Sequence, residues 1–536
     1  MAKRYLTHGQ FYGFNFQDAH ADAIEISDGS ITRVGRSDDL VNLASNQDTI
    51  TDLRQAFILP GFTDSHIHLL AFGLSLQRVD AAAGSKAACL ARVAEHAAAT
   101  PDGEWILGHG WDHNIWGDGY GTKDDLDHVS DRHPIYFTHK SLHCGWANSA
   151  ALRAAGITDS TADPPGGTIV RDEHNTPNGI LLENAMRIIE SAIPDPTDEQ
   201  VDTALLSAQQ ALHNFGITAV HDFDTWRVYP ALQRLQSHRE LALRVIKNIP
   251  QNTFDRALVQ EFKSGDGDDW IKIGWLKLFA DGALGPQTAA MLAPYEKSTG
   301  YGMLLLEKEE IVAIGEKALS AGIAMAVHAI GDRANRTVLS AFENLRDRGL
   351  FQIPQLHSRI EHVQVLAARD IPRFKELGII ASMQPIHAIS DMDMANAHWG
   401  DRCTNAYAWR SLLESHADVI FGSDAPVESP NPFLGIAAAI SRRRLQDPCS
   451  NATAAGWTAH QCLRFPEVIT AYCEAPNRIN HNRFSSEIGT TIMHADLVVL
   501  PADFASFSPE EIAHTLPSAT MVAGNWVYKN DKMDLE

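Results

Sequence analysis

The sequence lacks a net positive charge, a cysteine framework and long uninterrupted runs of apolar residues. Its 44 basic and 67 acidic side chains give a formal charge of −23, which disfavours nucleic acid and anionic membrane surfaces as partners. Its six cysteines are scattered and form no C-x-x-C pair, so we expect reduced thiols and a cytoplasmic location. No stretch approaches the ~18 apolar residues of a membrane span. The N-terminal residues also lack the apolar centre of a signal peptide.

The composition is that of an ordinary globular protein. Hydrophobic residues make up 44% of the 536 positions and charged residues 21%, which excludes disordered, collagen-like and coiled-coil chains. A chain of this length can bury a large core. It therefore needs neither disulfides nor a metal merely to fold.

Both ends of the chain are predicted to be β-rich. Near the N-terminus, two strand-like segments flank the turn Asp28–Ser30, and near the C-terminus residues 494–500 and 521–528 have a similar pattern. We therefore expect residues 1–55 and 485–536 to form one small β-sandwich.

The long middle of the chain alternates apolar runs with helical stretches. Eight runs are expected to be strands: 57–68, 217–223, 243–249, 271–279, 323–328, 359–363, 379–384 and 419–424. This alternation indicates a parallel sheet, and eight such units predict an α/β protein with a (β/α)8 TIM barrel within residues 56–484. The excess length after the first strand includes residues 100–185. We expect these residues to form an inserted subdomain covering the active face.

Two histidines end the first predicted barrel strand. Residues 64–68 read Asp-Ser-His-Ile-His, and alternation along a strand puts His66 and His68 on one side, where two imidazoles can chelate one metal. Alone this pair is weak evidence, because roughly one such match is expected by chance in a chain this rich in histidine.

Other predicted strands end in further candidate ligands. Lys277 lies in the fourth strand, His328 ends the fifth, His362 ends the sixth and Asp424 ends the eighth. Each alone has a structural interpretation, such as a core histidine or a turn cap. Barrel enzymes, however, gather catalytic residues at the carboxyl ends of several strands. Together these residue types suit zinc or another divalent first-row metal.

These residues and the phrases around them resemble the amidohydrolase superfamily. The similarity is greatest to its YtcJ-like branch, which includes N-substituted formamide deformylases, and it extends over essentially the whole chain. The matching phrases are Leu59-Pro-Gly-Phe-Thr-Asp-Ser-His-Ile-His68, Lys277-Leu-Phe-Ala-Asp-Gly-Ala-Leu-Gly285, Val327-His-Ala-Ile-Gly-Asp332, Arg359-Ile-Glu-His-Val363 and Phe421-Gly-Ser-Asp-Ala-Pro-Val427.

The resemblance implies a binuclear zinc centre. Its ligands would be His66, His68 and Asp424 for one ion, His328 and His362 for the other, and carboxylated Lys277 between them. The modification is chemically reasonable, because burial beside positive charge favours the neutral amine, which reacts with carbon dioxide. A site with a single metal ion stays open as an alternative.

The implied reaction is hydrolysis of a non-peptide C–N bond, in an amide or an N-substituted formamide, by metal-activated hydroxide. Asp424 would act as general base and then general acid, or as a metal ligand only. The same site also suits esters, lactones and phosphotriesters. A regulatory protein that binds metal or ligand without turnover is the alternative from another class. Superfamily members often form dimers or tetramers, so the resemblance implies a homo-oligomer acting on a small molecule.

Substrate contacts are expected from the inserted segment and from the segment after the seventh strand. The candidates are Trp111, His143, Trp146, Gln384, His387 and Arg402. The aromatic residues in these segments indicate a mostly apolar substrate. Arg402 would bind an anionic group of the substrate or pair with a nearby acidic residue.

Overall fold

The chain divides into two compact units. The computed structural model describes residues 2–14, 16, 20–116, 119–140, 143–350, 357–445, 456–479 and 493–530. The larger unit comprises Met1–Gly73 and Asp202–Glu536, and the smaller comprises Leu74–Val201. Parts of the expected sandwich, 485–492 and 531–536, lie outside the described residues. No helix within the described ranges is long and apolar enough to cross a membrane.

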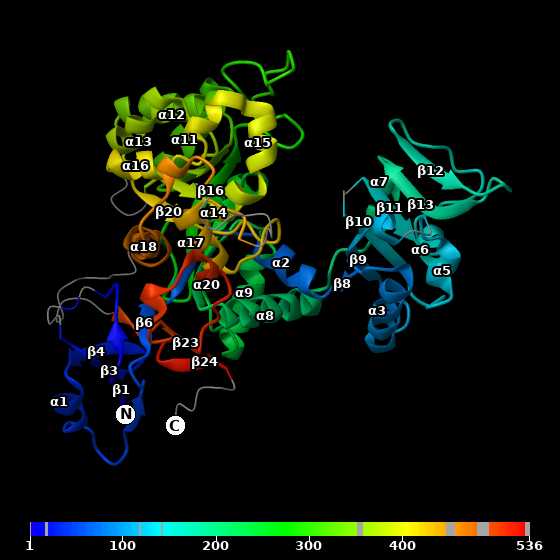
Figure 1. Ribbon diagram of the computed structural model, residues 1–536. Coiled ribbons are helices and arrows are strands. Elements are labelled where there is room, and N and C mark those ends of the chain that lie inside the picture. The colour runs from blue at the N-terminus through cyan, green and yellow to red at the C-terminus, as the bar shows by residue number, and fades with distance from the viewer. Residues whose placement is uncertain are drawn as a thin grey trace. The chain divides into compact units, whose positions relative to one another are not determined.

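Eight parallel strands form the barrel of the larger unit (Figure 1). In sheet order they are β7 (Phe62–Ile67), β14 (Ile217–Asp222), β15 (Arg244–Pro250), β16 (Ile271–Phe279), β17 (Met325–Ala329), β18 (Arg359–His362), β19 (Ile380–Met383) and β20 (Val419–Phe421). Every neighbouring pair in this order is parallel. The predicted α/β barrel is confirmed, and its strands follow the eight apolar runs.

The barrel closes where its first and last strands meet. A parallel bridge joins Ile67 to Ala425, just beyond β20. The amide of Asp424 donates to the carbonyl of His66 over 2.7 Å. These contacts place two candidate ligands, from opposite ends of the strand order, side by side.

The first apolar run forms two strands rather than one. β6 (Phe57–Pro60) pairs with β2 (Gln10–Phe11) and β22 (Leu497–Leu500) outside the barrel, whereas β7 belongs to the barrel. Gly61 separates them, and a Cβ there would lie 2.1 Å from Oγ1 of Thr218. The expectation of one continuous strand over 57–68 was therefore wrong, because this close approach lets the chain pass from one sheet to the other.

Helices lie between the barrel strands along the chain, and one follows the last strand. They include α8 (Asp198–Asn214), α9 (Val228–His238), α10 (Phe254–Val259), α11 (Lys308–Ser320), α12 (Asp332–Asp347), α13 (Ile371–Leu377), α14 (Pro385–Ser390), α15 (Met392–Trp399), α16 (Trp409–Glu414) and α17 (Pro432–Ser441). On α12, Val338, Phe342 and Leu345 lie on one buried stripe, as expected for a helix packed on a sheet.

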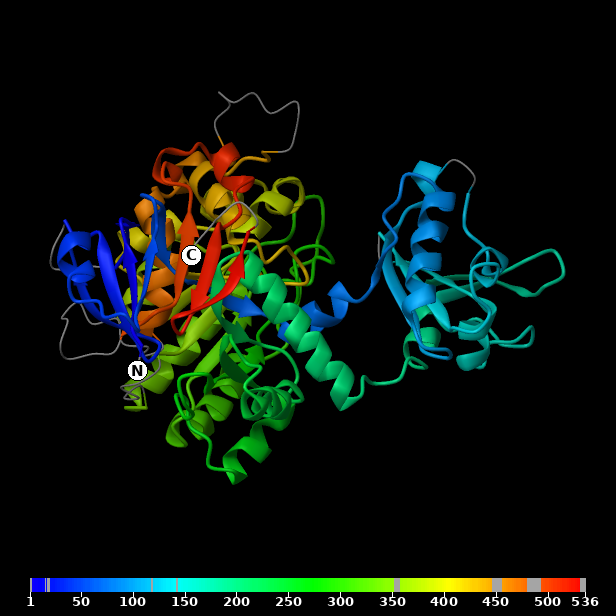
Figure 2. The same ribbon diagram turned by 90° about the horizontal axis from the view of Figure 1, so that it is seen from below.

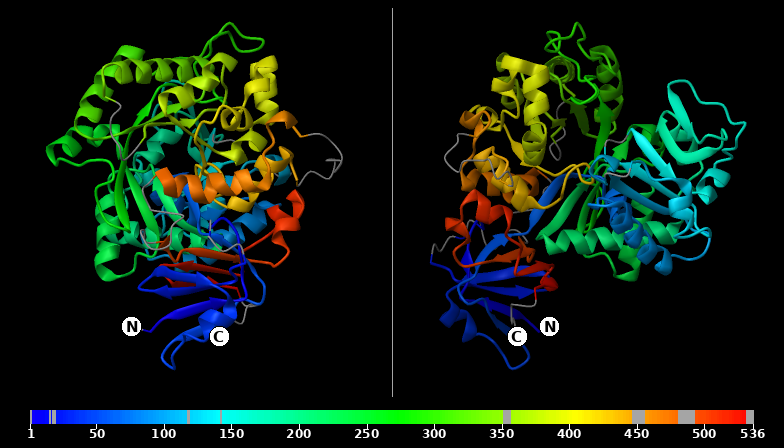
Figure 3. Two further views of the ribbon diagram at one scale, coloured as in Figure 1. Left: turned by 90° about the vertical axis from the view of Figure 1, so that its left-hand side faces the viewer. Right: turned by 45° about the vertical axis from the view of Figure 1, so that its right-hand side comes forward.

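Two five-stranded sheets are built from both ends of the chain. One has the order β21-β4-β3-β1-β5, with β21 (Met493–His494), β4 (Ser30–Gly35), β3 (Ala23–Ser27), β1 (Arg4–Thr7) and β5 (Thr49–Asp52). The other has the order β2-β6-β22-β23-β24, with β23 (Ala519–Val522) and β24 (Asn525–Lys529). Leu6, Ile24, Leu497 and Met521 from the two sheets share one hydrophobic core. Figures 2 and 3 show the blue N-terminal and red C-terminal strands side by side.

The smaller unit has a six-stranded mixed sheet and its own core. The order is β12 (Gly167–Arg171), β13 (Pro177–Glu183), β11 (Cys144–Ala147), β10 (Ile135–His139), β9 (Ile106–Trp111) and β8 (Val79–Asp80). Its longer helices include α3 (Lys86–Ala99) and α6 (Ser149–Ala154). Trp111, Phe137 and Trp146 are fully buried in its centre.

Candidate metal centre

The carboxyl ends of the barrel strands surround a cavity of about 360 Å³. All the expected ligands line it: His66, His68, Lys277, His328, His362 and Asp424. Its volume is within the range of small-molecule sites. The structure thus brings together side chains that are separated by up to several hundred residues in the sequence.

Asp424 lies at the centre of this group. Its Oδ1 is 3.3 Å from Nε2 of His68 and 3.5 Å from Nε2 of His66. The three ligand atoms all lie within 4.8 Å of one another. Asp424 and His362 both have left-handed backbone, with φ of 63° and 72°. Such conformations are uncommon outside glycine and concentrate at functional sites.

A buried ion pair orients His66. Nδ1 of His66 lies 2.6 Å from Oε2 of Glu361, and the same carboxylate accepts hydrogen bonds from Arg359. Burial alone would raise the pKa of Glu361, but Arg359 and His66 hold it well below its usual range. Because Glu361 is ionised and acts as an acceptor, Nδ1 of His66 carries the proton. The lone pair on Nε2 is therefore available to a metal.

His328 and His362 are similarly constrained. Nδ1 of His362 lies 3.0 Å from Oε1 of Gln384, and Nε2 of His328 lies 3.0 Å from the carbonyl oxygen of Gly282. Burial lowers the pKa of His328 to about 4, that of His66 to about 4, and that of His362 well below its ordinary value. These imidazoles are neutral near pH 7, which is the form that binds metals.

Lys277 lies within β16 and is almost fully buried, with 4% of its surface exposed. Its Nζ lies 4.5 Å from the ring centroid of Phe223 and 5.0 Å from that of Phe279. Burial lowers the pKa of the amine to about 8. Roughly a tenth of this lysine is therefore neutral at pH 7, far more than for a free lysine, and the neutral amine is the form that a nucleophilic or carboxylated lysine requires.

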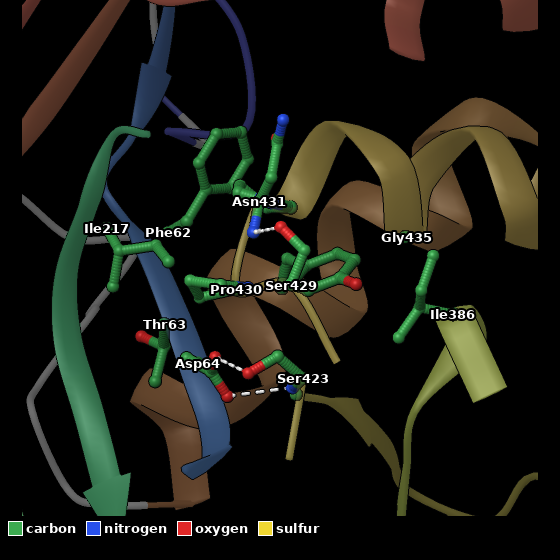
Figure 4. Close-up of a pocket in the computed structure, with 13 residues that line it drawn as sticks. Phe62, Thr63, Asp64, Ile217, Ile386, Ser423, Ser429, Pro430, Asn431 and Gly435 are labelled. Atoms are coloured by element: carbon green, nitrogen blue, oxygen red, sulfur yellow. Dashed lines mark hydrogen bonds between the residues drawn. The ribbon is translucent and has the colours of Figure 1, made fainter. Parts of the chain in front are cut away.

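Asp64 braces the loop that carries Asp424. Its carboxylate accepts hydrogen bonds from the amide of His66 at 3.1 Å, the amide of Ser423 at 3.0 Å and the hydroxyl of Ser423 at 2.5 Å. Figure 4 shows the Asp64–Ser423 pair within a separate small pocket of about 10 Å³, room for roughly one water. This contact joins β7 to the segment after β20.

Two of the predicted substrate contacts lie among the ligands. Gln384 is fully buried and contacts His362. Nε2 of His387 lies 3.3 Å from Oδ2 of Asp424, and its Nδ1 lies 3.9 Å from Glu428. Burial alone would lower the pKa of His387, but hydrogen bonds with Asp424 and Glu428 raise it to about 9. Both residues therefore position metal-type ligands, besides any contact with substrate.

Arg402, another predicted contact, is not among the residues that line the cavity. The guanidinium of Arg402 donates to the backbone carbonyls of Trp399, Ala293 and Pro294, so it braces a loop. In the smaller unit, Trp111 and Trp146 pack in its core and His143 contacts Glu183 over 3.0 Å. A substrate contact by these residues stays a prediction.

Arg359 and Glu361 were not predicted from the sequence as functional residues. A signal for them was present, because two charged residues at alternate positions of a buried strand point to the same face. In a barrel, that face is the interior below the ligands.

Comparisons with known proteins agree with this geometry. The profile of the amidohydrolase family matches residues 49–528. A putative amidohydrolase YtcJ of Bacillus subtilis is 30% identical over 98% of this chain and 99% of its own. The N-substituted formamide deformylase of Arthrobacter pascens is 26% identical over 79% of this chain and 81% of its own. A crystal structure of an uncharacterized metal-dependent hydrolase from Pyrococcus furiosus superposes with a TM-score of 0.76 and 26% identity, covering 95% of this chain and 100% of that chain.

Proposed function

This chain belongs to the amidohydrolase family and is a metal-dependent hydrolase, and we propose that it cleaves a non-peptide C–N bond in an amide or N-substituted formamide. The main support is the grouping of His66, His68 and Asp424 at the barrel mouth, with ligand atoms within 4.8 Å. The relative that is an N-substituted formamide deformylase supports the bond class.

The donor set fits divalent metal ions. Neutral imidazoles and a carboxylate are ligands that zinc accepts, and partners at Nδ1 of His66 and His362 leave Nε2 free to bind. His66, His68 and Asp424 would hold one ion, His328 and His362 would hold a second, and carboxylated Lys277 would be a ligand shared by both. A divalent ion bound here supplies Lewis acidity, which polarises a carbonyl and lowers the pKa of coordinated water.

Asp424 is the residue assigned to proton transfer. It accepts a proton from the attacking water and donates it to the leaving nitrogen, as a carboxylate within hydrogen-bond reach of both can do. His387, 3.3 Å from Oδ2, holds the carboxylate in place throughout. Asp424 therefore has two duties, as a metal ligand through one oxygen and as a proton carrier.

The cavity lining favours a neutral substrate with an apolar substituent. Part of the cavity wall is apolar and is formed by Phe279, Leu284, Ile330 and Val427. No arginine lies among the described residues that line the cavity. A substrate carboxylate would therefore lack a guanidinium partner in this part of the site. This argues against amino acid amides with a free carboxylate.

The test is an assay of the zinc-loaded full chain. The panel contains an N-aryl formamide, the matching acetamide, a formate ester, a lactone, a phosphotriester and an N-acyl amino acid. We expect the formamide or acetamide to be hydrolysed fastest. Asp424→Asn should lower kcat by about 10²–10⁴, the usual contribution of a positioned proton carrier, while most of the metal is retained.

A matched control replaces a carboxylate of structural function. Asp370 is buried, pairs with Arg336 and Arg373, and does not line the cavity. Asp370→Asn should change stability but leave kcat near that of the parent.

Turnover of esters or phosphotriesters without turnover of amides would move the assignment to those bonds. Full metal content without any turnover would indicate a binding protein.

The cytoplasmic location and the homo-oligomeric state stay as proposals. The first rests on scattered cysteines in the sequence, and the second on the resemblance to the superfamily. Light scattering after gel filtration measures the number of chains directly.

A further inference from the structure

The smaller unit contains a second group of metal-type ligands. Asp112, His113 and His139 each offer one ligand atom, and these atoms lie within 4.8 Å of one another. We propose that they bind one divalent first-row metal ion of the zinc type, with water completing its coordination. This site uses none of the residues assigned to hydrolysis.

The strand pairing explains why these three side chains meet. β9 and β10 are parallel neighbours in the sheet (Figure 1). At their carboxyl ends Trp111 pairs with His139 after a shift of register. The amide of Lys140 donates to the carbonyl of Trp111 over 3.1 Å, which holds the two ends together. Asp112 and His113 follow β9 directly, so they emerge at the edge where His139 ends β10.

The distances suit a small ion. Nε2 of His139 lies 3.5 Å from Oδ1 of Asp112, with 8% and 19% of these side chains exposed. Ligand atoms around tetrahedral zinc are roughly 3.3 Å apart, given bonds of about 2.0–2.1 Å. The rings of His113 and His139 have centroids 5.2 Å apart. The ligand atom of His113 lies within 4.8 Å of the other two.

His113 supplies a second, independent observation. Its Nδ1 is buried, and no described residue makes a hydrogen bond to it. A buried polar atom without a partner is destabilising, so native proteins rarely retain one. A bound cation at this nitrogen would remove that cost.

Aromatic side chains enclose the same three ligands. The ring of Tyr120 stacks on His113 at 4.0 Å, and Trp111 meets His139 edge-on at 4.7 Å. Packing alone accounts for rings in contact, but it does not account for a carboxylate placed beside two imidazoles. Two histidines and one carboxylate with an open position are a donor set typical of zinc and related ions.

Binding would stabilise the smaller unit. Asp112 and His113 begin the segment that contains the short helix α4 (His113–Trp116), whereas His139 belongs to the sheet. An ion held by all three would tie this segment to β10. The expected function is therefore structural.

The experiment measures zinc per chain by mass spectrometry, using the full chain stripped with chelator and dialysed against Zn²⁺. His113→Ala should lose one ion per chain. His113→Cys should keep it, because a thiolate is also a zinc ligand. The matched control is His109→Ala, because exposed His109 lies in β9 and contacts Thr138 instead. It should keep the parent count, and circular dichroism should show that every variant is folded.

The barrel ions are separated from this site by a double variant. His68→Ala should remove metal at the barrel, and adding His113→Ala should remove one more ion, because independent sites contribute additively. An unchanged count in His113→Ala would overturn the proposal. So would a folded His113→Cys chain that loses the ion, or no additional loss in the His68→Ala background.

Discussion

Replacement of Glu361 by glutamine is expected to weaken both folding and metal retention. The carboxylate accepts hydrogen bonds from Arg359 at 2.5 and 3.0 Å, and Nδ1 of His66 lies 2.6 Å away. The Arg359 and Glu361 side chains are fully buried. Glutamine would leave the guanidinium charge buried without its counterion, which costs about 3–5 kcal/mol when a buried pair is broken.

The effect on metal binding follows from the second contact of Glu361. A carboxylate behind a ligating histidine fixes its tautomer and ring orientation, and removing such a partner typically lowers metal affinity about 10–100-fold. The free energy of unfolding is measured by urea titration of the metal-free chain. Zinc affinity is measured by competition with a chromophoric chelator under conditions where each variant is folded.

Glu361→Asp separates the two effects. It keeps the charge beside Arg359 but shortens the side chain, so it should unfold less readily than Glu361→Gln while still losing zinc affinity. A folded Glu361→Gln chain that binds zinc as tightly as the parent would refute the reasoning. It would show that the orientation of His66 does not depend on this carboxylate.

Three further predictions concern other parts of the larger unit. Lys277→Ala should lower the zinc count per chain by at least one ion, measured by mass spectrometry, and an unchanged count would exclude Lys277 as a bridging ligand. Glu467→Gln should cost about 1–2 kcal/mol at pH 7, because Arg410 and Arg464 hold the pKa of Glu467 down at about 2. The stability is present above the ordinary pKa of 4.5 and is lost as the pH falls toward 2, so urea titrations of parent and variant should converge in acid. Gly61→Ala should destabilise by about 1–3 kcal/mol in urea, because its Cβ would overlap the Thr218 side chain, with contacts of 2.1–2.8 Å.

The fold was largely predictable from local patterns. Apolar runs such as 271–279 became strands, and the helical stretches between such runs became helices such as α11 and α12. Both outcomes were predictable because the hydrophobic period and the length are properties of a short segment. The break at Gly61 was not predictable in this way. It depends on contact with Thr218, which is distant in the sequence.

The candidate site was also predictable in part. His66, His68 and Asp424 were recognised because they end predicted strands, and the carboxyl ends of parallel strands meet at one face of a barrel. His387 was predicted only as a substrate contact. Its position in a helix after β19 gives no sign, in the sequence, that its side chain lies beside Asp424. The guanidinium of Arg402 donates hydrogen bonds to backbone carbonyls, and no pattern in the local sequence predicts these contacts.

The sequence by itself determined the order of strands and helices, the barrel, and the residue types at the strand ends, since each follows from periodicity over a few residues. Only the tertiary structure decided which side chains touch. Glu361 contacts His66 across 295 positions, and Asp64 contacts Ser423 across 359. The Asp64–Ser423 pair forms because closing the barrel brings β7 against the segment after β20, whereas Glu361 on β18 meets His66 on β7 across the barrel interior. The chemistry therefore depends on closure of the barrel, which no single segment of the chain encodes.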